Sequence, residues 1–599
     1  MFGWHGRLAT VDLTAGRVTY EDLDPNLLET YLGGRGLGVK LLADRLSPTV
    51  EPLSPDNLLV FAVGPLTGTN APTAGRFSVI TKSPLTGGIF DANSGGFWGP
   101  DFKACRLDAL ILTGRADRPV YLDIRPDSIE IREAGDLWGQ DVHQTTDQLR
   151  ERHGKTAKIA CIGPAGENLV RLAAIMNDYH RAAARGGVGA VLGSKRVKAL
   201  VVNARRRVEL ANRDGYHMVV KEAQRLIAQS PITSKALPEY GTASLMGVIN
   251  QFGLLGTKNF QQGTFAEADA ISGEAISDQI LVKKKPCFAC PIACGRETKV
   301  GDKIGEGPEF ETIYAFGPMC LVGNLTEVTE AGFLCNELGL DTISVGVTIS
   351  CAIELAERGY LKADLRWGDG VLVKQLVSDI AHRRGLGDHL AEGSRRFAAW
   401  AGAPDLAMQA KGLELPAYDP RGSKGMGLAY ATSNRGGCHL RAYLIGLEIL
   451  GVPKRIDRFS PDNKAGICIL MQNLNAAMDS LIECRFVESA NNEHHFARQL
   501  TMATGRSYEP EELLTIGERI WTLERLFNNA AGFSRADDTL PPRLLTEPLT
   551  DGMSRGQIVE LAPMVDDYYR ARGWDPAGRP TAAKLAELGL TDGILAGHQ

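Results

Sequence analysis

Residues 287–294 read Cys-Phe-Ala-Cys-Pro-Ile-Ala-Cys, which places Cys287, Cys290 and Cys294 in one short segment. Because the gaps between them are two and three residues, a tight loop can direct all three thiolates into one small volume, as an iron–sulfur cluster requires. A [4Fe-4S] cluster needs a fourth ligand, and a structural zinc site also needs four, usually from two paired motifs. No second closely spaced cysteine pair occurs in the chain, so the spacing favours an iron–sulfur cluster over zinc or unliganded thiols. The spacing does not select the fourth ligand among the eight other cysteines.

The composition is typical of a globular protein. The 599 residues are 44% hydrophobic and 23% charged, and this length predicts two to four domains, because single cores rarely exceed about 250–300 residues. The net charge is -5 and the compact basic runs, 205–207 and 283–285, are short, so nucleic-acid binding is not expected. Neither a run of about 18 apolar residues nor a signal-peptide pattern is present, so we expect no membrane span and a cytoplasmic location. In that compartment the eleven cysteines are expected as thiols, catalytic groups or metal ligands and not as disulfides.

The pattern of apolar residues along the chain changes near residue 210. Residues 1–210 are rich in glycine and short apolar runs, which predict a hairpin over 8–20 and strands over 58–63, 77–82, 109–113, 159–163 and 199–203. Helical patterns there cover 27–45 and 143–154. We therefore expect an α+β N-terminal domain.

Helical periodicity dominates the rest of the chain. It predicts one helix over 218–230 and another that begins with an N-cap at Thr326 and stops at Gly339. It also predicts a helix that ends near residue 481 and one that runs from Pro510 to the region of Asn528. The predicted fold is therefore α+β: a β-rich N-terminal base, residues 1–210, followed by two mostly α-helical domains, residues 211–415 and 416–599.

Four N-terminal segments combine glycine with arginine or amide side chains. They are residues 32–36, 73–77, 91–99 and 181–190. Glycine lets backbone N–H groups approach an anion closely, and arginine offers a planar fork to phosphate. None fits a dinucleotide-binding or Walker motif, and any one alone is more often a tight turn. Four in one domain favour a large phosphorylated cofactor.

Taken together, these segments resemble the tungsten-containing aldehyde ferredoxin oxidoreductase family over essentially the whole chain. The resemblance rests on Arg76, on residues 93–96 and 185–190, and on the cysteine motif, and it continues through residues 307–312, 336–341, 431–443 and 479–484. It implies a β-rich base that binds the cofactor beneath two helical domains. The implied cofactor is a tungsten bis-pyranopterin (tungstopterin), with the metal held by four dithiolene sulfurs, no protein ligand, and Mg2+ bridging the pterin phosphates.

The resemblance also implies the residues that bind this cofactor. A family motif Asp-x-x-Gly-Leu-Cys/Asp, which binds pterin amines, occurs here as residues 336–341 and 479–484. Two departures are Asn336 in place of aspartate, which removes a charge-assisted hydrogen bond, and Ile482-Glu483 in place of Gly-Leu. The implied cofactor-binding residues are Arg76, Asn93, Gly95, Arg181, Ala182, Ala183, Arg185, Gly186, Gly187, Asn336, Gly339, Leu340, Asp341, Arg441, Asp479 and Glu483. The implied cluster ligands are Cys287, Cys290, Cys294 and, from the end of the second motif, Cys484.

Two further residues carry the implied chemistry, the oxidation of an aldehyde to a carboxylic acid. Glu311 is the expected general base, since burial beside a cofactor raises a carboxyl pKa towards neutrality, and His439 is expected to hydrogen-bond a ligand of the metal or the substrate carbonyl. One cluster holds one electron at a time, which implies ferredoxin or an iron–sulfur electron-transfer subunit as partner, within an oligomer or a hetero-complex. The alternatives are an aromatic acyl-CoA reductase (benzoyl-CoA type) of the same family, disfavoured by the presence of both Glu311 and His439, and a zinc-stapled scaffold protein without redox chemistry.

Overall fold

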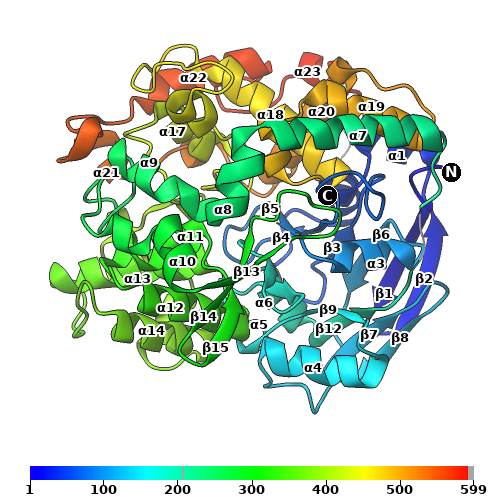
Figure 1. Cartoon of the computed structure of the whole chain (residues 1–599), viewed down its shortest axis with the longest axis horizontal. Helices are drawn as coiled ribbons and strands as arrows, with labels where there is room; N and C mark the ends of the chain where they lie inside the picture. The colour runs from blue at the N-terminus through cyan, green and yellow to red at the C-terminus, as the bar shows by residue number, and fades with distance from the viewer. Residues whose placement is uncertain (206–207, 591–599) are drawn as a thin grey trace.

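Two six-stranded mixed sheets form the N-terminal region of the computed structural model, which describes residues 1–205 and 208–590 (Figure 1). The first sheet has the order β2 (Arg17–Asp22), β1 (Arg7–Asp12), β6 (Ala109–Thr113), β3 (Leu59–Ala62), β4 (Phe77–Lys82), β5 (Ile89–Ser94). The second has the order β11 (Arg181–Ala183), β10 (Ile175–Asn177), β9 (Lys158–Cys161), β12 (Val197–Val202), β7 (Val120–Ile124), β8 (Ile129–Glu133). The edge strands β5 and β11 contact each other. The polar segments that follow these two strands are therefore brought together.

Both faces of the first sheet are buried at its inner strands β3 and β4, whereas the edge strand β2 is mostly exposed. In β3, Leu59 and Phe61 belong to one apolar core, and Val60 and Ala62 belong to another. Because successive side chains of a strand point to opposite faces, a continuous apolar run is what a strand covered on both sides requires. The second core also contains residues of α2 (Gly34–Arg45) and α20 (Pro510–Ala530), so the C-terminal helices pack directly on the N-terminal base.

The remainder of the chain is mostly helical. The longer helices are α7 (Arg213–Gln229), α12 (Leu325–Leu338), α13 (Thr342–Glu357), α14 (Gly370–His382), α18 (Lys464–Leu481), α19 (Glu493–Thr504), α20 and α22 (Leu561–Arg572). A small antiparallel sheet, β13 (Leu281–Lys285), β14 (Gly295–Val300) and β15 (Lys303–Glu306), lies at the junction between the N-terminal region and the helices α10 (Gly273–Gln279) and α12 (Figure 1). Within residues 1–205 and 208–590, no helix combines the length and the apolar character needed to cross a membrane.

The α+β fold expected from the sequence is confirmed, with differences at particular elements. The hairpin forms around residues 13–16, where Asp12 Oδ1 accepts the N–H groups of Thr14 and Ala15 at 3.1 and 3.0 Å. The helix predicted over 27–45 is two helices, α1 (Pro25–Tyr31) and α2, because the backbone turns at Leu32, whose φ is 62°. The N-cap predicted at Thr326 is wrong: Asn324 caps α12, and its side chain accepts the Glu327 N–H at 3.2 Å. The division near residue 415 stays a prediction.

Candidate active site and cofactor cavity

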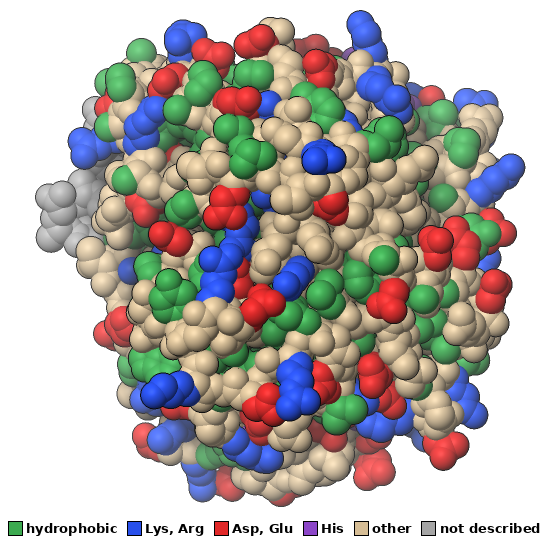
Figure 2. Space-filling view, turned by 90° about the vertical axis from the view of Figure 1, so that its left-hand side faces the viewer, with side chains coloured by type: hydrophobic (Ala, Val, Ile, Leu, Met, Phe, Trp, Pro, Cys, Tyr) green, Lys and Arg blue, Asp and Glu red, His purple; other side chains and the backbone are tan. Residues whose placement is uncertain are grey.

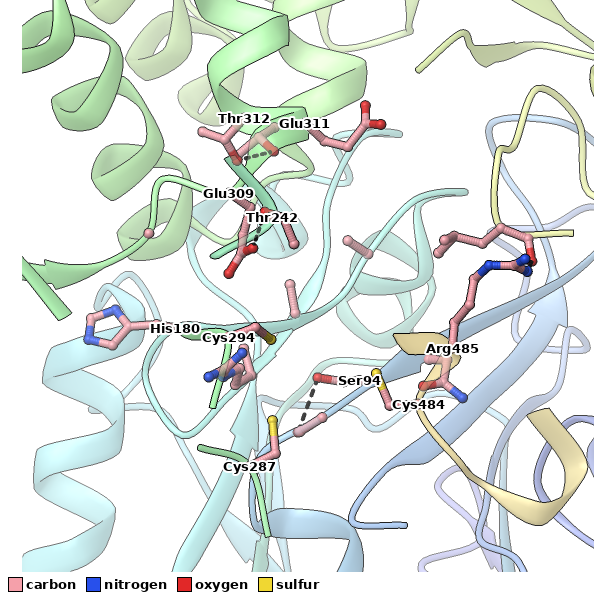
Figure 3. A pocket seen from close by; sticks show the side chains of 18 of the residues that line it. Ser94, His180, Thr242, Cys287, Cys294, Glu309, Glu311, Thr312, Cys484 and Arg485 are labelled. Carbon is pink, nitrogen blue, oxygen red and sulfur yellow. Dashed lines mark hydrogen bonds between the residues drawn. The ribbon is translucent and has the colours of Figure 1, made fainter. Parts of the chain in front are cut away.

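A cavity of about 410 Å³ lies between the N-terminal base and the helical region. The ends of β5 and β11, the cysteine loop after β13, and the turns after α12 and α18 all contribute to its wall. Figure 3 shows the sulfur atoms of Cys287, Cys294 and Cys484 towards one end and Glu311 towards the other. Of the residues predicted from the sequence, the cavity is lined by Arg76, Asn93, Gly95, Arg181, Ala182, Arg185, Cys287, Cys290, Cys294, Glu311, Asn336, Leu340, Asp341, His439, Arg441, Asp479, Glu483 and Cys484.

The cysteine loop is docked on the N-terminal base through its backbone. The Phe288 N–H donates to the Gly96 carbonyl at 3.1 Å, and the Thr73 N–H donates to the Ala289 carbonyl at 3.4 Å. Ala289 and Ala293 both have positive φ, 50° and 53°, so the loop coils tightly between its cysteines. This conformation keeps the three cysteines of the loop on the wall of a single cavity.

Cys484 reaches the same end of the cavity from the turn after α18. Its N–H donates to Thr73 Oγ1 at 3.2 Å, and Arg76 Nη1 donates to its sulfur at 3.8 Å. A Cβ atom at Gly95 would lie 3.0 Å from Cys287 Sγ and 3.2 Å from Arg76 Nη1, so the backbone approaches the thiols as closely as glycine permits. The four cysteines proposed as ligands thus share one end of the cavity, with a guanidinium beside them.

The four thiols are not arranged around a point that would hold one ion. Within the described parts of the chain, no three side chains of His, Cys, Asp or Glu come close enough to bind a single metal ion. A zinc ion would gather its ligands to about 2.0–2.3 Å, whereas the thiolates of a [4Fe-4S] cluster each bind a different iron atom. The assignment of the four cysteines to a cluster stays a prediction.

Buried arginine–carboxylate pairs surround the middle of the cavity. Arg185 Nε lies 3.1 Å from Asp341 Oδ2. Arg441 binds Asp91 Oδ2 through Nη2 at 2.9 Å and Asp479 Oδ2 through Nη1. Asp341 and Asp479, which the resemblance assigns to pterin amines, are therefore ion-paired, and the arginines present positive charge to the cavity.

The two copies of the repeated motif adopt the same local structure. Gly339 ends α12 with φ 75° and ψ 50°, and Ile482 ends α18 with φ 70° and ψ 35°. A left-handed conformation suits glycine but costs a β-branched residue about 1–2 kcal/mol, so Ile482 adopts a conformation for which the family glycine is better suited. The next residue, Glu483, is buried, both of its carboxylate oxygens lack a hydrogen-bond partner among the described residues, and burial raises its pKa to about 8.

Glu311 and His439 face each other across the other end of the cavity. Glu311 lies in the first turn of α11 (Phe310–Phe316), and its Oε1 is 3.6 Å from His439 Nε2. The Ala417 N–H donates to Glu311 Oε2 at 3.1 Å, while Oε1 has no hydrogen-bond partner among the described residues. Burial raises the pKa of Glu311 to about 8, and burial together with nearby cations such as Arg185 holds the pKa of His439 well below 6.5. Near pH 7 both side chains are therefore mostly neutral.

Cys438 and Arg435 form a buried pair that the sequence did not single out individually. Arg435 Nη2 donates to Cys438 Sγ at 2.8 Å, and the Leu440 N–H donates to the same sulfur at 3.3 Å. Burial raises the pKa of Cys438, but Arg435, Arg441 and Arg185 outweigh it and leave this pKa below its ordinary value. The resemblance pointed to residues 431–443 as a whole, but only the fold shows that the Cys438 thiol lies among arginine side chains, one residue before His439.

Four of the predicted cofactor-binding residues do not line the cavity. They are Ala183, Gly186, Gly187 and Gly339. A Cβ atom at Gly186 would lie 2.7 Å from the ring of Phe90, so this glycine is required by packing within the protein. Contact of these four residues with a cofactor stays a prediction.

The glycine-rich segment 32–36 packs against protein and not against the cavity. Arg35 is 1% exposed and binds Glu524 through Nε and Nη2 at 2.7 and 2.8 Å, with Asp479 Oδ2 at 3.3 Å. A Cβ atom at Gly34 would lie 2.4 Å from the Asp479 carbonyl oxygen. These glycines permit close approach of two backbones, so the expectation of an anion site at this segment is wrong.

Comparisons with known proteins match the chain along almost its full length. The family model for the N-terminal domain of aldehyde ferredoxin oxidoreductase matches residues 8–204, and the model for domains 2 and 3 matches residues 218–590. The chain belongs to the aldehyde ferredoxin oxidoreductase family. Within this family it is 47% identical to the tungsten-containing aldehyde ferredoxin oxidoreductase of Pyrococcus furiosus, over 99% of this chain and 100% of that protein. It is 45% identical to the enzyme of the same name from Thermococcus kodakarensis, with the same coverage.

The fold is also similar to that of a solved structure. The active-site complex BamBC of benzoyl coenzyme A reductase, bound to 1,5-dienoyl-CoA, superposes with a TM-score of 0.87 at 26% identity, covering 100% of this chain and 98% of that one. A base of β-sheets beneath helical domains is thus common to relatives that differ in substrate.

Proposed function

We propose that the protein is a tungsten-dependent aldehyde oxidoreductase. It oxidises aldehydes to carboxylic acids, a reaction that is reversible in principle, and transfers the electrons through one [4Fe-4S] cluster to ferredoxin or an iron–sulfur subunit. The observation that carries the proposal is that Glu311 and His439 line the same cavity as the four cysteines. The full-length similarity to tungsten-containing aldehyde ferredoxin oxidoreductases supports the same reaction. Aromatic acyl-CoA reduction is supported only by the structural likeness at 26% identity.

The side chains around the cavity fit a tungsten bis-pyranopterin with Mg2+ at its phosphates. Arginine matches the charge and the planar geometry of phosphate, and Arg435 Nε and Arg441 Nε have no hydrogen-bond partner among the described residues. Both oxygens of Glu483 are likewise unpartnered. Buried polar atoms cost free energy unless a partner satisfies them, so the arginine N–H groups are suited to the phosphates of this cofactor and the Glu483 oxygens to its N–H donors. The arginines proposed to hold this cofactor are Arg76, Arg181, Arg185, Arg435 and Arg441.

When bound, the tungsten centre accepts the two electrons released as aldehyde and water become carboxylic acid and two protons. Glu311 in its carboxylate form takes one of these protons at Oε1, the oxygen that accepts no hydrogen bond from another described residue. The hydrogen bond from the Ala417 N–H fixes the other oxygen and so orients the carboxyl group. Neutral His439 has one N–H to donate, and we assign that donor to the substrate carbonyl oxygen, where negative charge develops.

The positions of the cysteines and of Glu311 indicate the side of the cavity from which electrons would leave. The cysteines lie at the end of the cavity away from Glu311, so a cluster held there would receive electrons on the side opposite to the proton chemistry (Figure 3). Arg76, which contacts both Asn93 and Cys484, lies between the proposed pterin and cluster sites. An acceptor protein must then approach from the cysteine end. The cytoplasmic location expected from the sequence stays a prediction.

Elemental analysis of protein purified without oxygen tests the proposal first. We expect about one tungsten and about four irons per chain, followed by aldehyde-dependent reduction of benzyl viologen. Zinc with neither tungsten nor molybdenum, from cells supplied with both metals, would refute the catalytic proposal. Reduction of benzoyl-CoA without aldehyde activity would favour the acyl-CoA reductase alternative.

A further inference from the structure

A basic run lies beside the cysteine loop. Residues 283–285 are three lysines at the end of β13, and this strand stops two residues before Cys287. In the sequence this run has no assigned role. In the fold, the side chain of Lys283 is 62% exposed and Lys284 is also exposed. The basic run therefore directly precedes a loop whose three cysteines are partly exposed.

Apolar side chains form the centre of the same surface. Phe97 is 37% exposed, and its ring meets that of Phe288 edge-on with centroids 6.5 Å apart. Pro286, Ala289 and Pro291 are exposed around the cysteines. Aromatic and apolar side chains at a centre with charged groups at the rim are the composition of a protein interface.

Cations outnumber carboxylates around this centre, where Asp178 Oδ2 accepts the Phe97 N–H at 2.6 Å. Lys158 Nζ lies 5.0 Å from the centroid of the Phe97 ring. Glu297 pairs with Lys283 and Lys285 at 3.0 and 3.4 Å, but among residues 1–205 and 208–590 neither Lys158 nor Lys284 has a carboxylate within 4.0 Å. The patch made by Phe97, Lys158, Lys283, Lys284, Pro286 and Phe288 is called the cluster-loop patch below.

A small pocket extends the cluster-loop patch. Its volume is about 210 Å³, and Phe97, Lys158, Lys285 and Pro286 are part of its wall together with Arg150. Arg150 donates to the Tyr179 hydroxyl at 2.9 Å and has no carboxylate within 4.0 Å in the described chain. The wall also includes Arg181 and the carboxylates of Asp178 and Glu306, so four cations face two carboxylates and the pocket offers a net positive charge to a side chain of a partner.

We infer that the cluster-loop patch is the docking surface for the electron acceptor, a small one-electron iron–sulfur protein with an acidic face. The inference rests on the proposed function, because the cysteines must hold a cluster for electrons to leave there. Opposite charges steer the two proteins together, and the apolar centre stabilises the short-lived complex that electron transfer needs. Such complexes bury little surface, about 1,200 Å² or less, which a patch of this kind can supply.

An acidic protein fits this surface better than nucleic acid does. The chain carries a net charge of -5, and on the face in Figure 2 Lys and Arg side chains are interspersed with Asp and Glu, without a continuous basic track. The positive charge of the cluster-loop patch is local and surrounds an apolar centre. A nucleic-acid duplex instead requires an extended row of cations along its phosphates.

Charge reversal in the holoenzyme tests the inference. The variants are K284E and K158E/K284E, and K362E is the matched control, since Lys362 is an exposed lysine in the loop after α13. Aldehyde oxidation is measured with an acidic ferredoxin and, separately, with benzyl viologen, a small cationic dye. At low ionic strength we expect the double variant to lower kcat/KM for ferredoxin by about tenfold or more, and the difference to shrink near 0.5 M salt. Benzyl viologen reduction and K362E should stay within about twofold of wild type.

The outcomes separate this inference from the proposed function. Ferredoxin kinetics unchanged in both K284E and the double variant would overturn the docking surface. An equal loss with ferredoxin and with benzyl viologen would also overturn it, because it would place the effect inside the enzyme. DNA binding by wild type that is lost in the variants, with ferredoxin kinetics unchanged, would favour nucleic acid as the occupant. Absence of aldehyde-dependent dye reduction in wild type would instead refute the proposed function.

Discussion

The proton state of Glu311 should set how fast this enzyme works at each pH. A base is active when deprotonated, and burial raises the pKa of Glu311 to about 8. At that pKa about one molecule in ten carries the carboxylate at pH 7, and about nine in ten carry it at pH 9. We therefore expect kcat to rise about tenfold from pH 7 to pH 9, and to fall about tenfold more on going down to pH 6.

Replacing Glu311 by Gln should remove this dependence. Glutamine keeps the shape and can still accept the Ala417 N–H, but it cannot take a proton. A positioned general base contributes about 10²–10⁴-fold, so kcat of E311Q should fall by that factor and lose its rise through pH 8. Glu274 is an exposed carboxylate on α10, and E274Q should retain wild-type activity.

The assay is aldehyde-dependent viologen reduction without oxygen, with rates normalised to the tungsten bound by each variant. Normalisation separates a loss of chemistry from a loss of cofactor. A wild-type profile that is already flat above pH 6 would contradict the raised pKa. An E311Q enzyme within about threefold of wild type, with full tungsten, would refute Glu311 as the base.

Three further changes test other parts of the site. C484S should lower the iron content below that of wild type and give the electron paramagnetic resonance signal of a three-iron cluster, because one iron loses its thiolate ligand. C438S should shift the midpoint of the pH–rate profile to lower pH, since a thiolate at Cys438, favoured by the arginines that lower its pKa, would raise the pKa of Glu311, whereas a merely structural role would leave the midpoint in place. E483Q should make the apoprotein more stable by about 3 kcal/mol at pH 7, measured by urea unfolding, because the pKa of Glu483 is raised from 4.5 to about 8 and wild type loses stability as pH rises through that window. A urea midpoint that changes with pH alike in wild type and E483Q would contradict the last expectation.

The sequence predicted what short-range chemistry controls. The strands predicted over 77–82 and 109–113 have the expected bounds, and all but the last residue of the second are buried. The spacing of Cys287, Cys290 and Cys294 predicted a loop that brings three thiols together. The stop at Gly339 was also predictable, since a left-handed residue after a helix strongly favours glycine.

What the sequence did not predict depends on contacts between distant segments. Arg35 sits in a glycine-rich segment that resembles an anion site, yet it binds Glu524, which is 489 residues away. In the sequence, Cys438 is one of eight scattered cysteines, and only the fold places Arg435, Arg441 and Arg185 around it. At the break after Leu32 in the helix predicted over 27–45, Gly33 packs closely on the backbone after β3 and Gly34 on the end of α18. Local patterns carry no information about such pairings.

The distribution of the cavity wall along the chain has a consequence for how the enzyme matures. Residues from Thr73 to Phe486 line the cavity, and the fourth cysteine belongs to one of the last of these segments. A nascent chain still short of α18 has three of the proposed cluster ligands and part of the pterin site, but it lacks the helix that closes them in. Because domains fold as they leave the ribosome, the N-terminal base is expected to form first, while its cavity is not yet covered by the C-terminal helices. A large cofactor is therefore expected to enter late in synthesis or after it, before α18 and α20 pack onto the N-terminal sheets.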